Sequence, residues 1–152
     1  NSKDVNDRVF EELRLDEATV REVQALWEAF LRTGGGARGA AGEALYAAVF
    51  GAAPSLQRLF TTPRAVMAVR FIDGLNQIVS HLHDPPQMKV IVETLGFKHL
   101  ELEVTAPRVA IFRDAIADLL AMELGQLCSA KARDGLCTLL NYVGGAYIYI
   151  RV

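Results

Sequence analysis

The stretch LGFKH at residues 95–99 closes an apolar, helical part of the chain, and Pro107 follows eight residues after its histidine. Leu95 lies one helical turn before His99, so the two side chains share a face of the helix. A histidine on such a face can ligate iron through a neutral imidazole nitrogen. The alternative is an ordinary surface histidine near a helix end, and the rest of the sequence decides between the two.

The composition is that of a single folded domain. The chain has 152 residues, of which 51% are hydrophobic and 22% are charged, and this excludes an intrinsically disordered protein. A net charge of −2 without a basic block excludes a nucleic-acid-binding surface. No apolar run approaches the roughly 20 residues of a membrane span, and the polar start is not a signal peptide. We therefore expect a soluble, intracellular and cytoplasmic protein without membrane insertion.

The two cysteines, Cys128 and Cys137, are expected to be reduced thiols. Cys137 falls inside a predicted helix while Cys128 lies near its start, so a disulfide between them would need unusual geometry. Their spacing is also not that of a zinc site. The cysteines therefore indicate neither a disulfide framework nor a zinc protein.

Apolar residues recur at helical spacing along almost the whole chain. The predicted helical segments cover about residues 16–33, 38–53, 54–60, 63–83, 85–99, 107–124 and 129–147. Residues 100–104 alternate like a short strand, but their position favours a connector. The pattern predicts an all-α fold, with residues 1–15 as a tail or short pre-helix and residues 16–152 as the domain.

Residues that typically begin and end helices mark the boundaries of these segments. Asp16 and Ser129 are predicted N-caps, because short side-chain oxygens accept hydrogen bonds from the first helical turn. Thr62 and Pro63 are the predicted cap and first residue of another helix. Gly125 is the predicted end of a helix, since glycine readily takes the left-handed conformation there. The chain is thus divided into successive helices.

Two features weaken the last predicted helix. Gly144 and Gly145 lie in its interior, and each glycine costs about 1 kcal/mol relative to alanine. The alternation of residues 147–150 is also compatible with an extended segment. The sequence leaves open whether the chain ends in a helix or in extended backbone.

The order and spacing of several side chains resemble those of a globin over residues 16–150. Trp27 lies late in the first predicted helix, and Gly42 lies four residues before Tyr46, where globins use a glycine to let two helices cross closely. The further matching marks are Phe50, Pro54, Phe60, the distal-helix segment 71–84, Leu95, His99 and Pro107. The resemblance implies a globin fold, which is a three-on-three helical sandwich around a haem pocket, with haem b and its iron as the cofactor.

The resemblance also implies which side chains contact the haem. His99 would be the metal ligand, with Leu95 packed under the porphyrin and the second imidazole nitrogen of His99 donating to a backbone carbonyl. The implied pocket residues are Tyr46, Phe50, Phe60, Met67, Arg70, Phe71, Leu95, His99, Val104 and Phe112. The candidates to meet the haem propionates are Arg64, Lys98 and Arg108.

Tyr46 stands eight residues before Pro54, where many microbial, plant-like and invertebrate globins carry a distal tyrosine. Its phenol hydroxyl would donate a hydrogen bond to dioxygen held in the pocket. In a dry pocket such a bond contributes about 1–3 kcal/mol, or roughly 10- to 100-fold in affinity. The alternative is a core tyrosine whose hydroxyl is satisfied elsewhere.

The distal helix departs from the pattern of vertebrate globins. In the register that fits its apolar residues, Met67 stands where vertebrate globins have the distal histidine, and Ala68 lies opposite Gly42. We expect Met67 to line the pocket, with ligation of iron by its thioether as the alternative. Arg70 would reach the gas ligand or a propionate, unless it is a solvated side chain.

The resemblance implies a binding protein that reversibly binds dioxygen or another diatomic gas at a haem iron ligated by His99. The enzymatic alternative is a nitric oxide dioxygenase, which would need a separate reductase because the chain carries no flavin or nicotinamide domain. A haem-free, globin-like structural or interaction domain is the third possibility, since the distal histidine is missing. The start without methionine is expected of a processed chain or a piece of a longer, multidomain protein. A homo-oligomer also stays open.

Overall fold

The computed structural model describes residues 5–33, 38–59, 62–98 and 104–151, and all regular structure in these ranges is helical. The elements are α1 (Glu17–Arg32), α2 (Arg38–Ala52), η2 (Pro54–Leu59), α3 (Arg64–Ser80), α4 (Pro85–Lys98), α5 (Ala106–Leu124), η3 (Gly125–Leu127) and α6 (Ala130–Arg151), where η denotes a 3-10 helix. None of these helices is both long enough and apolar enough to cross a membrane. The predicted all-α fold is confirmed.

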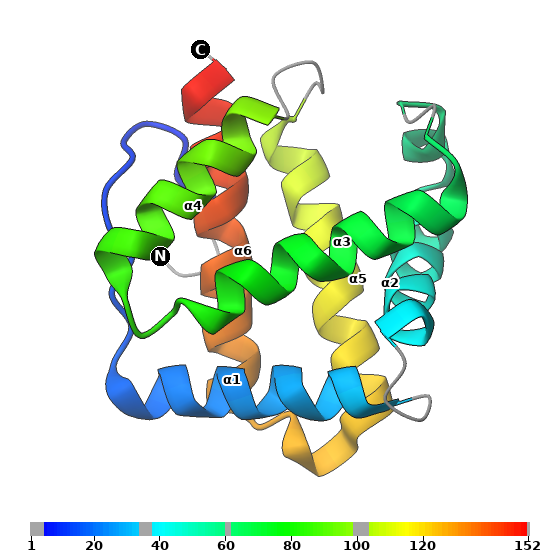
Figure 1. Ribbon diagram of the computed structural model, residues 1–152, viewed down its shortest axis with the longest axis horizontal. Helices are drawn as coiled ribbons and strands as arrows, with labels where there is room; N and C mark the ends of the chain where they lie inside the picture. The colour runs from blue at the N-terminus through cyan, green and yellow to red at the C-terminus, as the bar shows by residue number, and fades with distance from the viewer. Residues whose placement is uncertain (1–4, 34–37, 60–61, 99–103, 152) are drawn as a thin grey trace.

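The helices pack in crossed layers. Figure 1 shows α3 passing across α5 and α6, with α1 along one end of the molecule, α2 on one side and α4 on the other. In this arrangement α2 packs on α3 and α5, and α4 packs on α6. The end of α4 and the start of α5 lie at the same edge of the molecule as η2 (Figure 1).

Side-chain oxygens cap the starts of three helices. The backbone N–H of Thr19 donates to Asp16 Oδ1 (2.8 Å), that of Arg108 to Thr105 Oγ1 (3.4 Å), and that of Ala132 to Ser129 Oγ (3.0 Å). Gly125 ends α5 with a φ of 55°, in the left-handed region that glycine enters without steric penalty. The predicted caps Asp16 and Ser129 and the predicted end at Gly125 are confirmed.

Both ends of α3 differ from the prediction. Pro63, rather than Thr62, occupies the N-cap position, and its ψ of 146° keeps its backbone extended, so Arg64 is the first helical residue. At its other end α3 stops at Ser80, about three residues earlier than predicted. Residues 81–84 instead form a hydrogen-bonded turn that leads into α4.

α6 is a regular helix through residues 147–150, so the extended alternative is wrong. Its two adjacent glycines lie at contacts that leave no room for a side chain. A Cβ on Gly144 would lie 2.6 Å from Cγ2 of Val109 in α5. A Cβ on Gly145 would lie 2.8 Å from the carbonyl carbon of Asn6. The close packing that these glycines permit offsets their low helix propensity.

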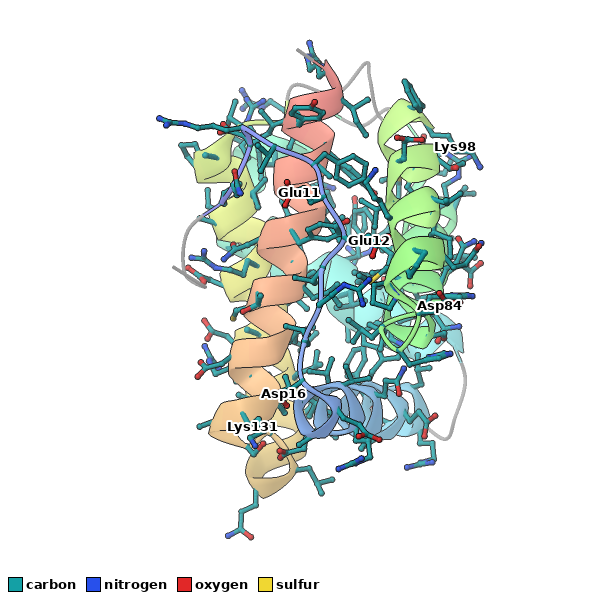
Figure 2. All side chains as sticks on the ribbon, turned by 90° about the vertical axis from the view of Figure 1, so that its left-hand side faces the viewer. Glu11, Glu12, Asp16, Asp84, Lys98 and Lys131 are labelled. Carbon is teal, nitrogen blue, oxygen red and sulfur yellow. The ribbon has the colours of Figure 1, made fainter. Side chains whose placement is uncertain are left out.

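Residues 5–15, which we call the N-terminal strap, form no helix and lie along α6 on the side that faces α4 (Figure 2). The ring of Phe10 packs on that of Tyr142 with 5.9 Å between their centroids, and Nζ of Lys89 in α4 lies 4.8 Å from the Phe10 centroid. The hydroxyl of Tyr142 donates to the carbonyl oxygen of Glu11 at 2.5 Å. The strap therefore touches both helices.

Two groups of buried side chains fill the interior. The larger group joins all six α-helices, and its largest fully buried members are Leu26, Phe30, Leu45, Ile72, Leu82, Met88, Leu120 and Leu139. The smaller group lies between α2, η2 and α3 and consists of Tyr46, Phe50, Ala53, Leu56, Met67 and Ala68. The smaller group contains several of the residues that the sequence assigns to the site.

Cys128 and Cys137 are free and half-buried. Burial raises the pKa of each thiol, while the Arg133 guanidinium acts on both in the opposite direction. Both thiols therefore stay protonated at neutral pH, and neither cysteine forms a disulfide in the structure.

Candidate functional site

Five of the predicted site residues come together where α2, α3 and α5 meet. We call Tyr46, Phe50, Met67, Phe71 and Phe112 the distal cluster. The first three are buried, and the two others are half-buried and pack against them. The ring centroids lie 4.6 Å apart for Tyr46 and Phe50, 6.1 Å for Phe50 and Phe71, and 6.4 Å for Phe71 and Phe112. Aromatic pairs at such distances attract each other beyond the area they bury, so the cluster ties three helices together.

The close crossing of α2 and α3 fixes the register of the distal cluster. A Cβ on Gly42 would lie 2.9 Å from the carbonyl carbon of Ala68, a distance at which one of the helices would have to move. The predicted contact between Gly42 and Ala68 is therefore confirmed. Met67, the neighbour of Ala68, is 6% exposed and packs in the cluster beside Tyr46.

Tyr46 is the polar member of the distal cluster, and a neighbouring amide binds its hydroxyl. Nε2 of Gln57 in η2 donates to Tyr46 Oη at 2.8 Å. A phenol oxygen can accept a hydrogen bond and still donate its own proton to another group. The hydroxyl of Tyr46 thus keeps a proton available for a second partner, although its side chain is only 5% exposed.

A cation covers the ring of Tyr46. Cζ of Arg64, the first residue of α3, lies 4.5 Å from the Tyr46 centroid, within the range of a cation–π contact. Nε of Arg64 also donates to Oε2 of Glu43 at 2.8 Å. Both side chains of this ion pair are about half exposed, so it adds little to the free energy of folding. Its effect is to hold the guanidinium over the ring.

Arg70 does not join the distal cluster. It lies on α3 one turn after Met67, and its side chain is exposed. The exposure agrees with the solvated alternative, and its role toward a gas ligand or a propionate stays a prediction.

The remaining predicted residues lie near the end of α4 and the start of α5. Leu95 is half-buried and packs against the larger core, and Val104 is half-buried just before α5. A Cβ on Gly96 would lie 2.7 Å from Cδ1 of Ile150, so α4 and α6 are in close contact here. Phe60 and His99, which the sequence assigns to the pocket, lie outside the described residues.

The residues present fit a haem group. Haem is a large apolar disc with two carboxylates at one edge. The distal cluster offers apolar and aromatic surface from three helices, and Leu95 offers apolar surface from a fourth. Lys98, at the exposed end of α4 in Figure 2, is a cation of the kind that the carboxylates need. Within the described ranges no three His, Cys, Asp or Glu side chains gather to hold a bare metal ion. The apolar and aromatic lining of the distal cluster and Leu95 suits an organic, mainly apolar group.

Sequence reasoning missed Gln57, which donates to the Tyr46 hydroxyl, and Glu43, which binds the Arg64 guanidinium that lies over the Tyr46 ring. Gln57 follows Pro54 by three residues, one turn of a 3-10 helix. Glu43 precedes Tyr46 by three residues and therefore lies on the same face of α2. The spacing of Glu43 could have been recognised, whereas the contact of Gln57 depends on how η2 turns back toward α2.

A protein-family model described as Globin matches residues 43–143. The match covers about two thirds of the chain and runs from α2 into α6. It includes the whole distal cluster as well as Leu95 and His99. No curated protein matches the chain significantly.

Proposed function

Because the chain belongs to the globin family, we propose that it binds haem b and, through the haem iron, reversibly binds dioxygen or another diatomic gas. The observation that carries this proposal is the distal cluster, in which the buried residue Tyr46 brings a hydroxyl among aromatic and thioether side chains. Bound haem supplies the iron at which a diatomic gas coordinates. The side chains of the chain itself do the rest.

The apolar members of the distal cluster exclude water from the gas ligand. Phe50 is 5% exposed and Met67 6% exposed, and neither side chain can donate a hydrogen bond. A polar contact made among such groups is stronger than the same contact in water, because the local dielectric constant is low. The apolar side chains of the cluster would therefore strengthen a hydrogen bond donated by the Tyr46 hydroxyl.

Tyr46 is the proposed donor to the gas ligand. Its hydroxyl keeps a proton to donate while it accepts from Gln57. Dioxygen as the ligand would carry partial negative charge and would accept such a bond, whereas carbon monoxide would accept it less well. We therefore expect Tyr46 to favour dioxygen over carbon monoxide.

His99 is the proposed iron ligand on the opposite side, within the family match at residues 43–143. Leu95 is placed one turn earlier on α4 and would pack under the porphyrin. The second ring nitrogen of His99 would donate to a backbone carbonyl and so fix which tautomer binds the iron.

The test is a titration of the haem-free protein with haemin, followed by absorption spectroscopy of the ferric and ferrous forms. We expect a saturable Soret band at one haem per chain, and a reversible spectral change when dioxygen is admitted to the ferrous protein. Met67→Leu should leave these spectra unchanged if Met67 only lines the pocket. Absence of a Soret band with excess haemin would contradict the proposal and favour a haem-free structural or interaction domain.

Nitric oxide dioxygenation is the second candidate function, and a hydroxyl-bearing residue buried in the cluster, Tyr46, favours it. Such a reaction would consume nitric oxide and dioxygen, give nitrate, and need one electron for each turnover. The electron would come from a separate reductase. The test is nitrate formation over repeated turnovers with an added flavoprotein reductase. A protein that binds dioxygen but forms no nitrate beyond one equivalent is a binding protein only.

A further inference from the structure

Gln57 and Tyr46 come from different elements, and their hydrogen bond has a defined direction. Gln57 lies on η2 and Tyr46 on α2, and Nε2 lies 2.8 Å from Oη. A side-chain amide nitrogen can only donate, so the phenol oxygen is the acceptor. The phenol proton must then point away from the Gln57 amide nitrogen.

We propose that Gln57 is a positioning residue, which sets the direction of the Tyr46 proton so that it is donated to the gas ligand. This inference rests on the proposed function, because a gas ligand has to be present to receive the proton. It adds a residue outside the distal cluster to the determinants of gas affinity, and that residue acts on the ligand only through Tyr46.

The backbone that carries Gln57 is anchored beside the cluster. The neighbouring residue Leu56 is 5% exposed and packs in the same buried group as Tyr46 and Phe50. Its backbone N–H donates to the carbonyl oxygen of Ala53 at 3.0 Å, which fixes the first turn of η2. The exposed side chain of Gln57 therefore starts from a fixed point at the rim of the cluster.

A second contact keeps the ring of Tyr46 in place. The Arg64 guanidinium lies over the ring at 4.5 Å and is held there by Glu43. Two aromatic rings also pack near it, with the centroids of Phe50 and Phe71 at 4.6 and 6.4 Å from that of Tyr46. With the ring held in this way, the remaining freedom of Tyr46 is rotation of its hydroxyl, and that is the freedom that Gln57 restricts.

The deciding variant is Gln57→Glu, which keeps the shape of the side chain and reverses the hydrogen bond. An ionised carboxylate only accepts, so the proton of Tyr46 would turn toward residue 57. We expect the dioxygen dissociation rate of Gln57→Glu to rise by roughly 10- to 100-fold, as far as in Tyr46→Phe. Gln77→Glu makes the same change at an exposed position of α3 and should leave the rate unchanged.

A second measurement on the haem-free protein separates this inference from the proposed function. In ultraviolet resonance Raman spectra the tyrosine Fermi doublet distinguishes a phenol that accepts from one that donates, and subtraction of Tyr46→Phe isolates Tyr46. We expect the signature of Tyr46 to change from acceptor to donor in Gln57→Glu. Circular dichroism checks that this variant is folded.

Each outcome decides one of the two proposals. A changed Raman signature together with faster dioxygen loss supports the role of Gln57. A changed signature with an unchanged dissociation rate overturns it, and so does an unchanged signature in folded protein. Failure to bind haem overturns the proposed function and, with it, the role of Gln57 toward a gas ligand. The Raman spectrum of the haem-free protein still reports the direction of the hydrogen bond between Gln57 and Tyr46.

Discussion

Gly42 in α2 and Ala68 in α3 lie so close that a Cβ on Gly42 would come within 2.9 Å of the Ala68 carbonyl carbon. The obstacle is backbone rather than the end of a flexible side chain, so the strain cannot be relieved by a change of rotamer. This contact sets how closely α2 and α3 approach each other. It thereby fixes the positions of Tyr46 and Met67 in the distal cluster.

The first prediction concerns that crossing. Gly42→Ala should lower the free energy of unfolding by about 1–3 kcal/mol, because it overpacks a contact between two helix backbones. The control is Gly74→Ala on α3, where a new Cβ meets nothing within 4 Å. It should raise stability by up to about 1 kcal/mol through helix propensity. Urea denaturation measures both variants, and equal effects of the two would refute the importance of the crossing.

The second prediction concerns the N-terminal strap. Gly145→Ala would push against the backbone of Asn6, at 2.8 Å from its carbonyl carbon. We expect the strap to leave α6 more often, so that limited proteolysis within residues 5–15 becomes faster while α6 itself stays helical. The control is Gly51→Ala, where the added Cβ meets nothing within 4 Å. Unchanged cleavage of the strap in Gly145→Ala would show that the strap is held by other contacts.

The third prediction concerns the alkaline stability of the protein. Burial raises the pKa of Tyr142 to about 12 from an ordinary value of 10, and the Glu12 carboxylate adds to the rise. Between these two pH values the unfolded chain loses the tyrosine proton while the folded chain keeps it. The contribution of Tyr142 to stability is therefore complete below pH 10 and is lost as the pH rises through 12.

The measurement is the thermal midpoint of the protein as a function of pH. Tyr142→Phe should show a shallower decline between pH 10 and pH 12 than the unaltered chain. At neutral pH the same variant should be less stable by about 1 kcal/mol, because the hydrogen bond to the Glu11 carbonyl is lost. Tyr149→Phe removes a hydroxyl from an exposed tyrosine and serves as the control. Parallel pH profiles for Tyr142→Phe and the unaltered chain would contradict the assignment.

The sequence predicted those parts of the fold that depend on local chemistry. The caps Asp16 and Ser129 bind backbone N–H groups only three residues away, and Gly125 ends α5 through its own backbone conformation. The structure has all three where they were expected. The contact of Gly42 with Ala68 was expected from the resemblance to globins, and the structure confirms it.

Contacts between distant segments could not be read from the sequence in the same way. The strap was predicted as a tail or pre-helix, yet Phe10 and Tyr142 meet across more than a hundred residues. Residues 147–150 alternate as a strand would, but packing in α6 overrides that pattern. The bond of Gln57 to Tyr46 arises from the path of η2, which periodicity does not reveal.

The fourth prediction concerns the hydroxyl of Tyr46. Tyr46→Phe keeps the ring, which packs at 4.6 Å from that of Phe50, and removes only the donor. The dioxygen dissociation rate should rise roughly 10- to 100-fold, whereas carbon monoxide dissociation should change much less. Stopped-flow measurements with the two gases check this. An equal change for both gases would indicate that the ring has moved rather than that a hydrogen bond was lost.

The central claim is that His99 holds a haem iron in this globin, and it is tested most directly by the absorption spectrum of His99→Gly reconstituted with haemin. The account predicts that the visible absorption bands of the variant differ from those of the unaltered protein. Imidazole added to the solution should restore the original bands. His83→Gly, at an exposed turn position, should keep the original spectrum. A His99→Gly spectrum identical to that of the unaltered protein, without added imidazole, would contradict the account.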